Sequence, residues 1–329
     1  MAAERHRSLL STIAAALLLW GCGDSVSNAP AAYVPPVVTP PAADDTTPFL
    51  LSQTGLYIDI QSKQLAPDLI AFSPRFVLWS DGAQKQRWLR LPAGTTIDTS
   101  DMDHWQFPVG TIVFKEFAVD GKRIETRMIM RTGEADTDYF MGAFAWNDDE
   151  SDALFVRDGQ DNARDTPHDI PQARQCLTCH DGEAGRILGF SAVQQPDVDL
   201  ELLSVPPDAP FEPPGDATTQ AALGYLHANC GHCHNLHGTS WPDTDMDLRL
   251  NVADISVEQT AAYRTTVGVR MQSFNTSPLT LRITSGDPAQ SGVHYRMSMR
   301  GPRIQMPPLA TELVDDSGLA LVDAWIESL

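Results

Sequence analysis

A five-residue pattern that occurs twice constrains this chain more than any other feature. Cys-x-x-Cys-His stands at residues 176–180 and again at residues 230–234. The 329-residue chain has only one further cysteine, Cys22. Two cysteines separated by two residues and followed at once by histidine are the attachment pattern of c-type haem. If both pairs carry haem and Cys22 carries a lipid, no cysteine remains for a disulfide, so the fold must be held by its cores and by covalent haem.

The chemistry of haem attachment requires this spacing. The two thiols of a pair add to the two vinyl groups of one porphyrin, while the adjacent imidazole reaches the iron from the same side. We therefore predict two haem c groups, with His180 and His234 as ligands of the two irons. The residues predicted to bind them covalently or through iron are Cys176, Cys179, His180, Cys230, Cys233 and His234.

Three other kinds of site share parts of this pattern. Zinc ribbons separate their cysteine pairs by about 15 to 20 residues, whereas 50 residues lie between Cys179 and Cys230. A four-cysteine zinc site also leaves the histidine after each pair unexplained. A redox-active dithiol favours a βαβ setting, which this sequence does not indicate. Disulfides explain neither the identical spacing nor the histidines.

Met306 is the predicted second iron ligand at the second motif. It is followed by Pro307 and Pro308, which stiffen the loop that holds its sulfur. A thioether ligand favours reduced iron and raises the potential, as an electron carrier requires. The rivals in this part of the chain are His294, Met246, Met271, Met297 and Met299.

The first motif has no comparable ligand downstream. Between Asp181 and Ala217 there is neither methionine nor histidine. The first iron must then take a ligand from another part of the chain or keep an open position. The candidates are His168, Met128, Met130, Met141 and His104.

The N-terminus carries features of an export signal. Arg5 and Arg7 precede a short apolar stretch that ends at Leu19-Trp20-Gly21-Cys22, which resembles the bacterial lipoprotein cleavage box. We predict a signal peptide over residues 1–21, lipidation of Cys22, and a proline-rich tether over residues 22–48. The mature protein is then exported and lipid-anchored to a bacterial membrane, facing the periplasm or the cell surface.

The rest of the chain divides into three predicted parts. Residues 49–160 show short apolar runs broken by turns, which predicts a β-rich domain. Its clearest element is a hairpin in which Asp120-Gly121 joins strands over residues 111–119 and 122–131. Residues 161–217 form the first haem-attachment segment with a proline-rich linker. Residues 218–329 show helical periodicity over 218–229 and near the C-terminus, where Asp315 or Asp316 is the predicted N-cap.

Several stretches resemble a family of exported dihaem c-type cytochrome lipoproteins. They are Phe76-Val77-Leu78-Trp79-Ser80-Asp81-Gly82-Ala83, Phe107-Pro108-Val109-Gly110-Thr111, Glu125-Thr126-Arg127, Leu188-Gly189-Phe190-Ser191 and Ala222-Leu223-Gly224-Tyr225-Leu226-His227-Ala228-Asn229. Residues 218–329 also resemble the small c-type cytochrome domain, in which two terminal helices pack together. The resemblance implies an α+β multidomain fold: an antiparallel β-sandwich-like domain, an irregular haem-binding segment and an all-α cytochrome c domain.

The charge of the chain bears on its partners. The formal net charge is −20, which excludes the cationic surface that nucleic-acid binding needs. Because opposite charges attract, we expect the redox partner of an acidic electron carrier to be basic. We therefore predict electron transfer outside the cytoplasm by a carrier rather than an enzyme. Two alternatives stay open: a dihaem peroxidase-like enzyme with an open first haem, and a polymer- or glycan-binding β domain with an attached cytochrome.

Overall fold

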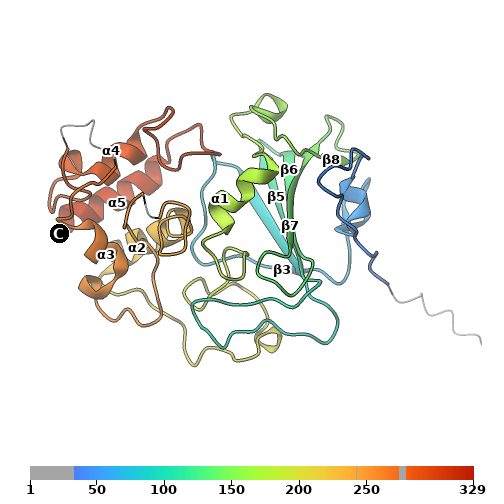
Figure 1. Ribbon diagram of the computed structural model, residues 1–329, viewed down its shortest axis with the longest axis horizontal. Coiled ribbons are helices and arrows are strands. Elements are labelled where there is room, and N and C mark those ends of the chain that lie inside the picture. Colours follow the sequence, from blue (N-terminus) through green and yellow to red (C-terminus); the bar gives the residue numbers. More distant parts are fainter. Residues whose placement is uncertain (1–32, 242, 274–278) are drawn as a thin grey trace, which may run out of the picture. The chain divides into compact units, whose positions relative to one another are not determined.

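The main sheet has six antiparallel strands that follow one another in chain order. The computed structural model describes residues 33–329 except Pro242 and residues 274–278, and Figure 1 shows this sheet beside a group of helices. The six strands are β3 (Ile70–Ala71), β4 (Gln84–Arg90), β5 (Ile112–Val119), β6 (Lys122–Arg131), β7 (Tyr139–Trp146) and β8 (Ala153–Phe155). Strands β1 (Tyr57–Asp59) and β2 (Gln64–Leu65) form a separate two-stranded sheet.

The predicted hairpin is confirmed. Asp120 and Gly121 join β5 to β6 and both have positive φ, at 50° and 78°, as a tight two-residue turn requires. The register shifts after the pair Phe117–Glu125, so that Arg123 lies opposite Ala118. This bulge puts Arg123 on the face of Glu116, whereas strict alternation along β6 would place it on the face of Glu125.

Both faces of the six-stranded sheet are covered. On one face Trp88, Phe114 and Met128 pack against the segment around Phe49 and Leu51. On the other face the cover comes from irregular chain, where Phe107 and Phe190 pack against Leu89 and Val113. Met128 on β6 is fully buried in the first of these two covers.

The helices are short. They are α1 (Cys176–His180), α2 (Ala217–Asn229), α3 (Ala261–Thr266), α4 (Gly292–Ser298) and α5 (Asp316–Ser328). The 3₁₀ turns are η1 (Leu51–Gln53), η2 (Ala163–Asp165), η3 (Ala173–Gln175), η4 (Leu200–Leu202), η5 (Val257–Gln259) and η6 (Pro288–Gln290). The predicted terminal helices are confirmed: α2 and α5 pack together, and Asp315 caps α5 by accepting a hydrogen bond from the Gly318 amide.

The predicted fold class is wrong in two of its three parts, the β-sandwich and the all-α cytochrome c domain. Of the described residues only 21% are helical and 19% are in strands, and the described part of residues 218–329 does not form an all-α cytochrome c domain. Between α2 and α5 the described chain is mostly irregular, because glycine and proline interrupt it and only α3 and α4 form there. The β-sandwich is wrong because irregular chain supplies most of the apolar cover of the six-stranded sheet. The second sheet has only two short strands and contributes Tyr57 and Leu65 on one face.

Residues 35–329 form one compact unit by their internal contacts. The segment before β4 reaches α2: the Trp79 amide donates to Asn229 Oδ1 at 2.7 Å, and the Phe76 ring packs on Gly224. No helix within the described residues is long and apolar enough to cross a membrane. The predicted signal peptide and Cys22 lie outside the described residues, as does the first part of the tether.

Candidate functional site

The first cysteine pair lies on a helix of little more than one turn. The 3₁₀ turn η3 runs directly into α1, which begins at Cys176 and ends at His180. Both cysteines are free thiols and are partly buried. At helical spacing, Cys176 and Cys179 lie on the same side of α1, so a single ligand can meet both sulfurs.

His180 is oriented by a backbone contact. Its Nδ1 lies 2.7 Å from the carbonyl oxygen of Arg186. Since a carbonyl only accepts, Nδ1 carries the hydrogen and Nε2 keeps its lone pair. Burial lowers the pKa of His180 to about 4, so the ring is neutral at pH 7. A neutral imidazole with Nδ1 bonded to a carbonyl is the form that binds a metal through Nε2.

The second pair follows the C-terminus of α2. Cys230 ends that helix by donating its amide to the Leu226 carbonyl, and the Cys233 and His234 amides both bond back to the Cys230 carbonyl. His234 Nδ1 lies 3.2 Å from Ser240 Oγ, and that hydroxyl donates its own hydrogen to the Cys233 carbonyl at 2.6 Å. The hydroxyl therefore accepts from Nδ1, which again leaves Nε2 free. Burial lowers the pKa of His234 to about 4.

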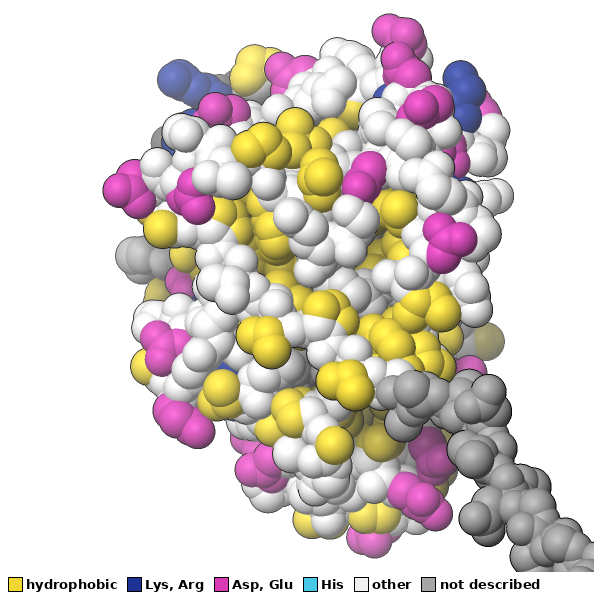
Figure 2. Space-filling model, turned by 90° about the vertical axis from the view of Figure 1, so that its right-hand side faces the viewer, with side chains coloured by type: hydrophobic (Ala, Val, Ile, Leu, Met, Phe, Trp, Pro, Cys, Tyr) yellow, Lys and Arg dark blue, Asp and Glu magenta, His cyan; other side chains and the backbone are white. Residues whose placement is uncertain are grey.

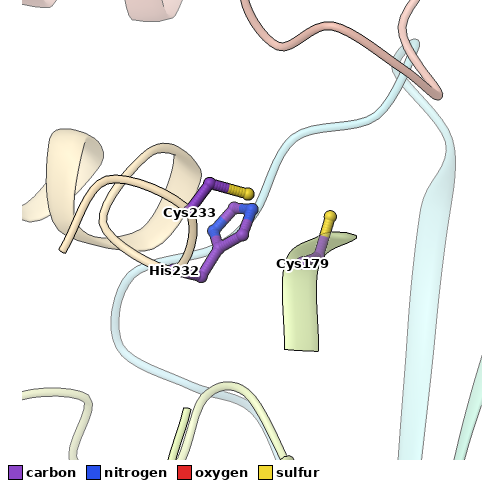
Figure 3. Close-up of side chains that lie close together, drawn as sticks. All are labelled: Cys179, His232 and Cys233. Atoms are coloured by element: carbon purple, nitrogen blue, oxygen red, sulfur yellow. The ribbon is translucent and has the colours of Figure 1, made fainter. Parts of the chain in front are cut away.

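The two motifs lie against each other, although 50 residues separate them in the sequence. Figure 3 shows His232 and Cys233 facing Cys179, and the ligand atoms of these three residues lie within 4.8 Å of one another. Thr178 links the motifs through its carbonyl, which accepts from Cys233 Sγ at 3.0 Å and from Thr239 Oγ1 at 2.8 Å. Contact with the Cys179 sulfur and burial raise the pKa of the Cys233 thiol.

Each motif lines its own cavity. The first cavity lies between α1 and the six-stranded sheet; its volume is about 170 Å³, below the range of ligand pockets. Besides the motif residues, its lining contains Phe72, Phe76, Val113, Ile129, Met141, Ile187 and Phe190, together with the cations Arg87, Lys115 and Arg127. The second cavity lies between the two motifs and α4; its volume is about 480 Å³, within the range of ligand pockets. Cys179, His232 and Leu309 line both cavities, so the two cavities adjoin.

Met306 lines the second cavity together with His234, as its predicted role requires. Met246, Met271 and Met297 line the same cavity, so the lining alone does not choose among the four. The remaining rivals do not line it. Met299 is 37% exposed, and His294 bonds through Nδ1 to the Asp323 carboxylate at 2.7 Å.

Of the candidates for the first iron, Met128 and Met141 line the first cavity, but the Met128 side chain packs on the opposite face of the sheet with Trp88 and Phe114. Met130 lies outside it. His168 is buried elsewhere, with Nε2 at 2.7 Å from Glu125 Oε1. His104 bonds to Glu183 at 3.4 Å.

His232 is a functional candidate that sequence reasoning missed. It is buried, it lines both cavities, and its Nδ1 has no hydrogen-bond partner among the described residues. The signal that could have found it is its place inside the second motif, where the first motif has Thr178. His227 also lines the first cavity, but its Nδ1 accepts the Leu250 amide at 3.1 Å and is engaged.

Comparison of the chain with protein-family models, with curated proteins and with solved structures gives no match. The resemblance to exported dihaem cytochrome lipoproteins therefore stays a prediction, and so do export and lipid anchoring. Any functional conclusion has to come from the site itself.

Proposed function

We propose that this protein is a dihaem c-type cytochrome that transfers electrons. The observation that carries the proposal is the arrangement of the two Cys-x-x-Cys-His motifs. They lie against each other, each at the wall of a largely apolar cavity, with the ligand atoms of Cys179, Cys233 and His232 within 4.8 Å.

The orientation of the two histidines supports the proposal independently. In both motifs Nδ1 is bonded to a neighbouring oxygen, and Nε2 makes no hydrogen bond within the described residues. His180 and His234 are also the residues that the sequence pattern assigns to iron. The same tautomer at both sites is what a metal ligand needs and is not required of a histidine that only packs.

The residues present fit covalently attached haem. All four motif cysteines are free thiols, the cavities are lined mainly by apolar side chains, and a thioether is available at Met306 in the second one. Haem bound there supplies one-electron chemistry at iron. The chain's own part is to hold each group by two sulfurs and one imidazole, to exclude water, and to keep the two attachment points adjacent.

Intact mass of the purified protein tests the attachment. We expect two haems on each parent chain and one haem on the double variant Cys176→Ala, Cys179→Ala. Cys22→Ser is the matched control, because it removes a cysteine outside both motifs; it should keep both haems and leave the membrane fraction. If the double variant still carries two haems, the assignment of the first motif is wrong.

The redox partner in this proposal is basic. Acidic side chains are distributed around the face drawn in Figure 2, in keeping with the net charge of −20. Attraction between an acidic carrier and a basic partner raises the association rate and is screened by salt. Electron exchange with a basic cytochrome should therefore slow as salt increases, whereas exchange with an acidic one should become faster.

A metal ion held by Cys179, His232 and Cys233 is a second candidate. Their proximity and the unbonded Nδ1 of His232 favour it, and two cysteines with one histidine are a known zinc ligand set. The two candidates exclude each other, because a cysteine joined to haem is no longer a thiolate. Elemental analysis of the parent and of His232→Ala separates them: bound zinc that His232→Ala loses would support the metal site, and haem iron without zinc would exclude it.

The peroxidase-like alternative stays a prediction. It requires an open position at the first iron; of the predicted ligands Met128 and Met141 line that cavity, and Met128 turns its side chain to the core on the opposite face of the sheet. A spectrum of the first haem that cyanide leaves unchanged would argue against this alternative.

A further inference from the structure

Three cations lie side by side across the centre of the sheet. Arg87 on β4 is directly opposite Lys115 on β5, and Lys115 is directly opposite Arg127 on β6. Their side chains therefore project from the same face, and all three line the first cavity. Like charges placed directly opposite each other on neighbouring strands are destabilising, so this cationic row (Arg87, Lys115, Arg127) calls for a compensating charge.

The compensation within the chain is incomplete. Of the three cations, only Arg127 has an anionic partner among the described residues: its Nε lies 3.0 Å from Glu125 Oε1. Within the part of the chain that the structure describes, the side chains of Arg87 and Lys115 make no hydrogen bond and no ion pair. Lys115 Nζ lies 4.8 Å from the centre of the Phe117 ring, a weak substitute for a counter-ion. Burial, followed by the charges of Arg87 and Arg127, lowers the pKa of Lys115 well below its ordinary value.

Other buried arginines in the same molecule are paired. Arg90 bonds to Asp68 through two nitrogens, at 2.8 and 3.0 Å. Arg249, which also lines the first cavity, lies 3.0 Å from Glu183. The unpaired cations of the row are therefore exceptional in a chain with net charge −20, where carboxylates outnumber cations. Buried charges in proteins are paired or bind a ligand.

The row shares its cavity with the first cysteine pair. Cys176, Cys179 and His180 line the first cavity from α1, and Arg87, Lys115 and Arg127 line it from the sheet. A group attached to the two sulfurs therefore shares one cavity with the three cations. Haem carries two propionate carboxylates at its edge, and arginine and lysine are the side chains that bind carboxylates.

We propose that the cationic row of Arg87, Lys115 and Arg127 is a carboxylate site that binds the propionates of the haem attached to Cys176 and Cys179. This inference rests on the proposed function and deepens it. The row fixes the edge of that haem, and its positive charge favours the reduced iron, which carries one positive charge fewer.

The test compares charge-removing variants of the full, haem-loaded chain. Lys115→Met and Arg87→Gln should each shift the reduction equilibrium of one haem about ten-fold toward the oxidised state, which is 59 mV for one electron. Lys115→Arg keeps the charge and should restore the parent equilibrium. Lys85→Met is the matched control: Lys85 is two residues from Arg87 on β4, but it does not line the cavity and donates to the Ala83 carbonyl instead. It should change the equilibrium less than two-fold.

Intact mass separates this proposal from the proposed function. If no haem is attached at the first motif, the proposed function fails there and the propionate site fails with it. If both haems are attached but Lys115→Met and Arg87→Gln both leave the equilibrium within two-fold of the parent, the carboxylate site alone is wrong. Failure of Lys115→Arg to restore the parent value contradicts a role for charge. If added succinate changes the parent spectrum and Lys115→Met abolishes this change, the ligand is a free carboxylate and not the propionate.

Discussion

The sulfur of Met306 and the ring of His234 line one cavity, and this pairing is open to a direct test. We expect Met306→Ala to shift the reduction equilibrium of one haem at least ten-fold toward the oxidised state, because a thioether ligand favours reduced iron. Redox titration followed by absorbance measures the shift. Met299→Ala removes an exposed methionine that does not line the cavity, and it should leave the equilibrium unchanged. If Met306→Ala and Met299→Ala change the reduction equilibrium equally, Met306 is not the ligand.

Gly182 sets how closely the two motifs approach. A Cβ at this position would come within 2.4 Å of the His232 carbonyl oxygen and 2.8 Å of the Gly238 Cα, both backbone atoms that cannot move aside alone. Gly182→Ala should therefore lower the free energy of unfolding by about 1–3 kcal/mol, as measured by denaturant titration. At Gly133 the nearest atom is the flexible carboxylate of Asp138. Gly133→Ala should therefore lower the free energy of unfolding by less than Gly182→Ala does. A larger loss for Gly133→Ala would contradict the close backbone approach at Gly182.

At the residue scale, the spacing of residues along the chain predicts which side chains form the site, but it does not predict the contacts between distant segments. The Cys-x-x-Cys-His pattern names six side chains, and the structure places all six at two adjoining cavities. Spacing could not show that Cys179 meets Cys233, because that contact depends on how two distant segments pack. For the same reason His168 was a candidate by proximity in sequence, whereas its ring is bonded to Glu125 on β6.

Among the elements, β6 carries a buried carboxylate whose ionisation should control acid stability. Burial by itself raises the pKa of Glu125, but the Arg127 charge and the hydrogen bond to His168 outweigh burial and lower it to about 2. A depressed pKa stabilises the fold fully above the ordinary value of 4.5. That contribution is lost as the pH falls through the folded pKa of about 2.

Glu125→Gln should therefore lower the free energy of unfolding by about 3 kcal/mol at pH 7. The difference from the parent should shrink steadily between pH 4.5 and pH 2, as followed by urea unfolding at a series of pH values. Glu134→Gln is the control, because that carboxylate is 92% exposed and its nearest cation is 4.0 Å away. A gap between parent and Glu125→Gln that stays constant with pH would show that Glu125 is not ionised in the fold.

Elements with a strong local signal were predictable, and those that depend on tertiary packing were not. The hairpin of β5 and β6 follows from Asp120-Gly121 between two alternating runs, and α2 and α5 follow from their periodicity. The all-α prediction is wrong because the periodicity of two helices carries no information about the chain between them, which is mostly irregular. The sandwich failed because alternation shows that a strand face is buried and does not show what covers it.

Within residues 35–329, the chain before β4 and helix α2 are joined by one buried amide. Asn229 accepts the Trp79 amide at 2.7 Å through Oδ1 and donates through Nδ2 to the Val77 carbonyl at 3.3 Å. Phe76 in the same segment packs on Gly224. This contact lies beside the second motif, since Cys230 follows Asn229 directly. Strand and helix regions that share such contacts should unfold together.

Asn229→Ala should lower the free energy of unfolding by about 1–3 kcal/mol, because it leaves the partly buried Trp79 amide without its partner. The unfolding transition of this variant should remain a single one. Circular dichroism and tryptophan fluorescence should give the same midpoint, and that midpoint should be lower than in the parent. Asn251→Ala is the matched control, because no hydrogen bond is seen from the Asn251 side chain within the described residues, and it should change stability by less than about 0.5 kcal/mol. Two separate midpoints in the parent chain would show that residues 35–329 contain independently folding parts and that the contact at Asn229 joins them only weakly.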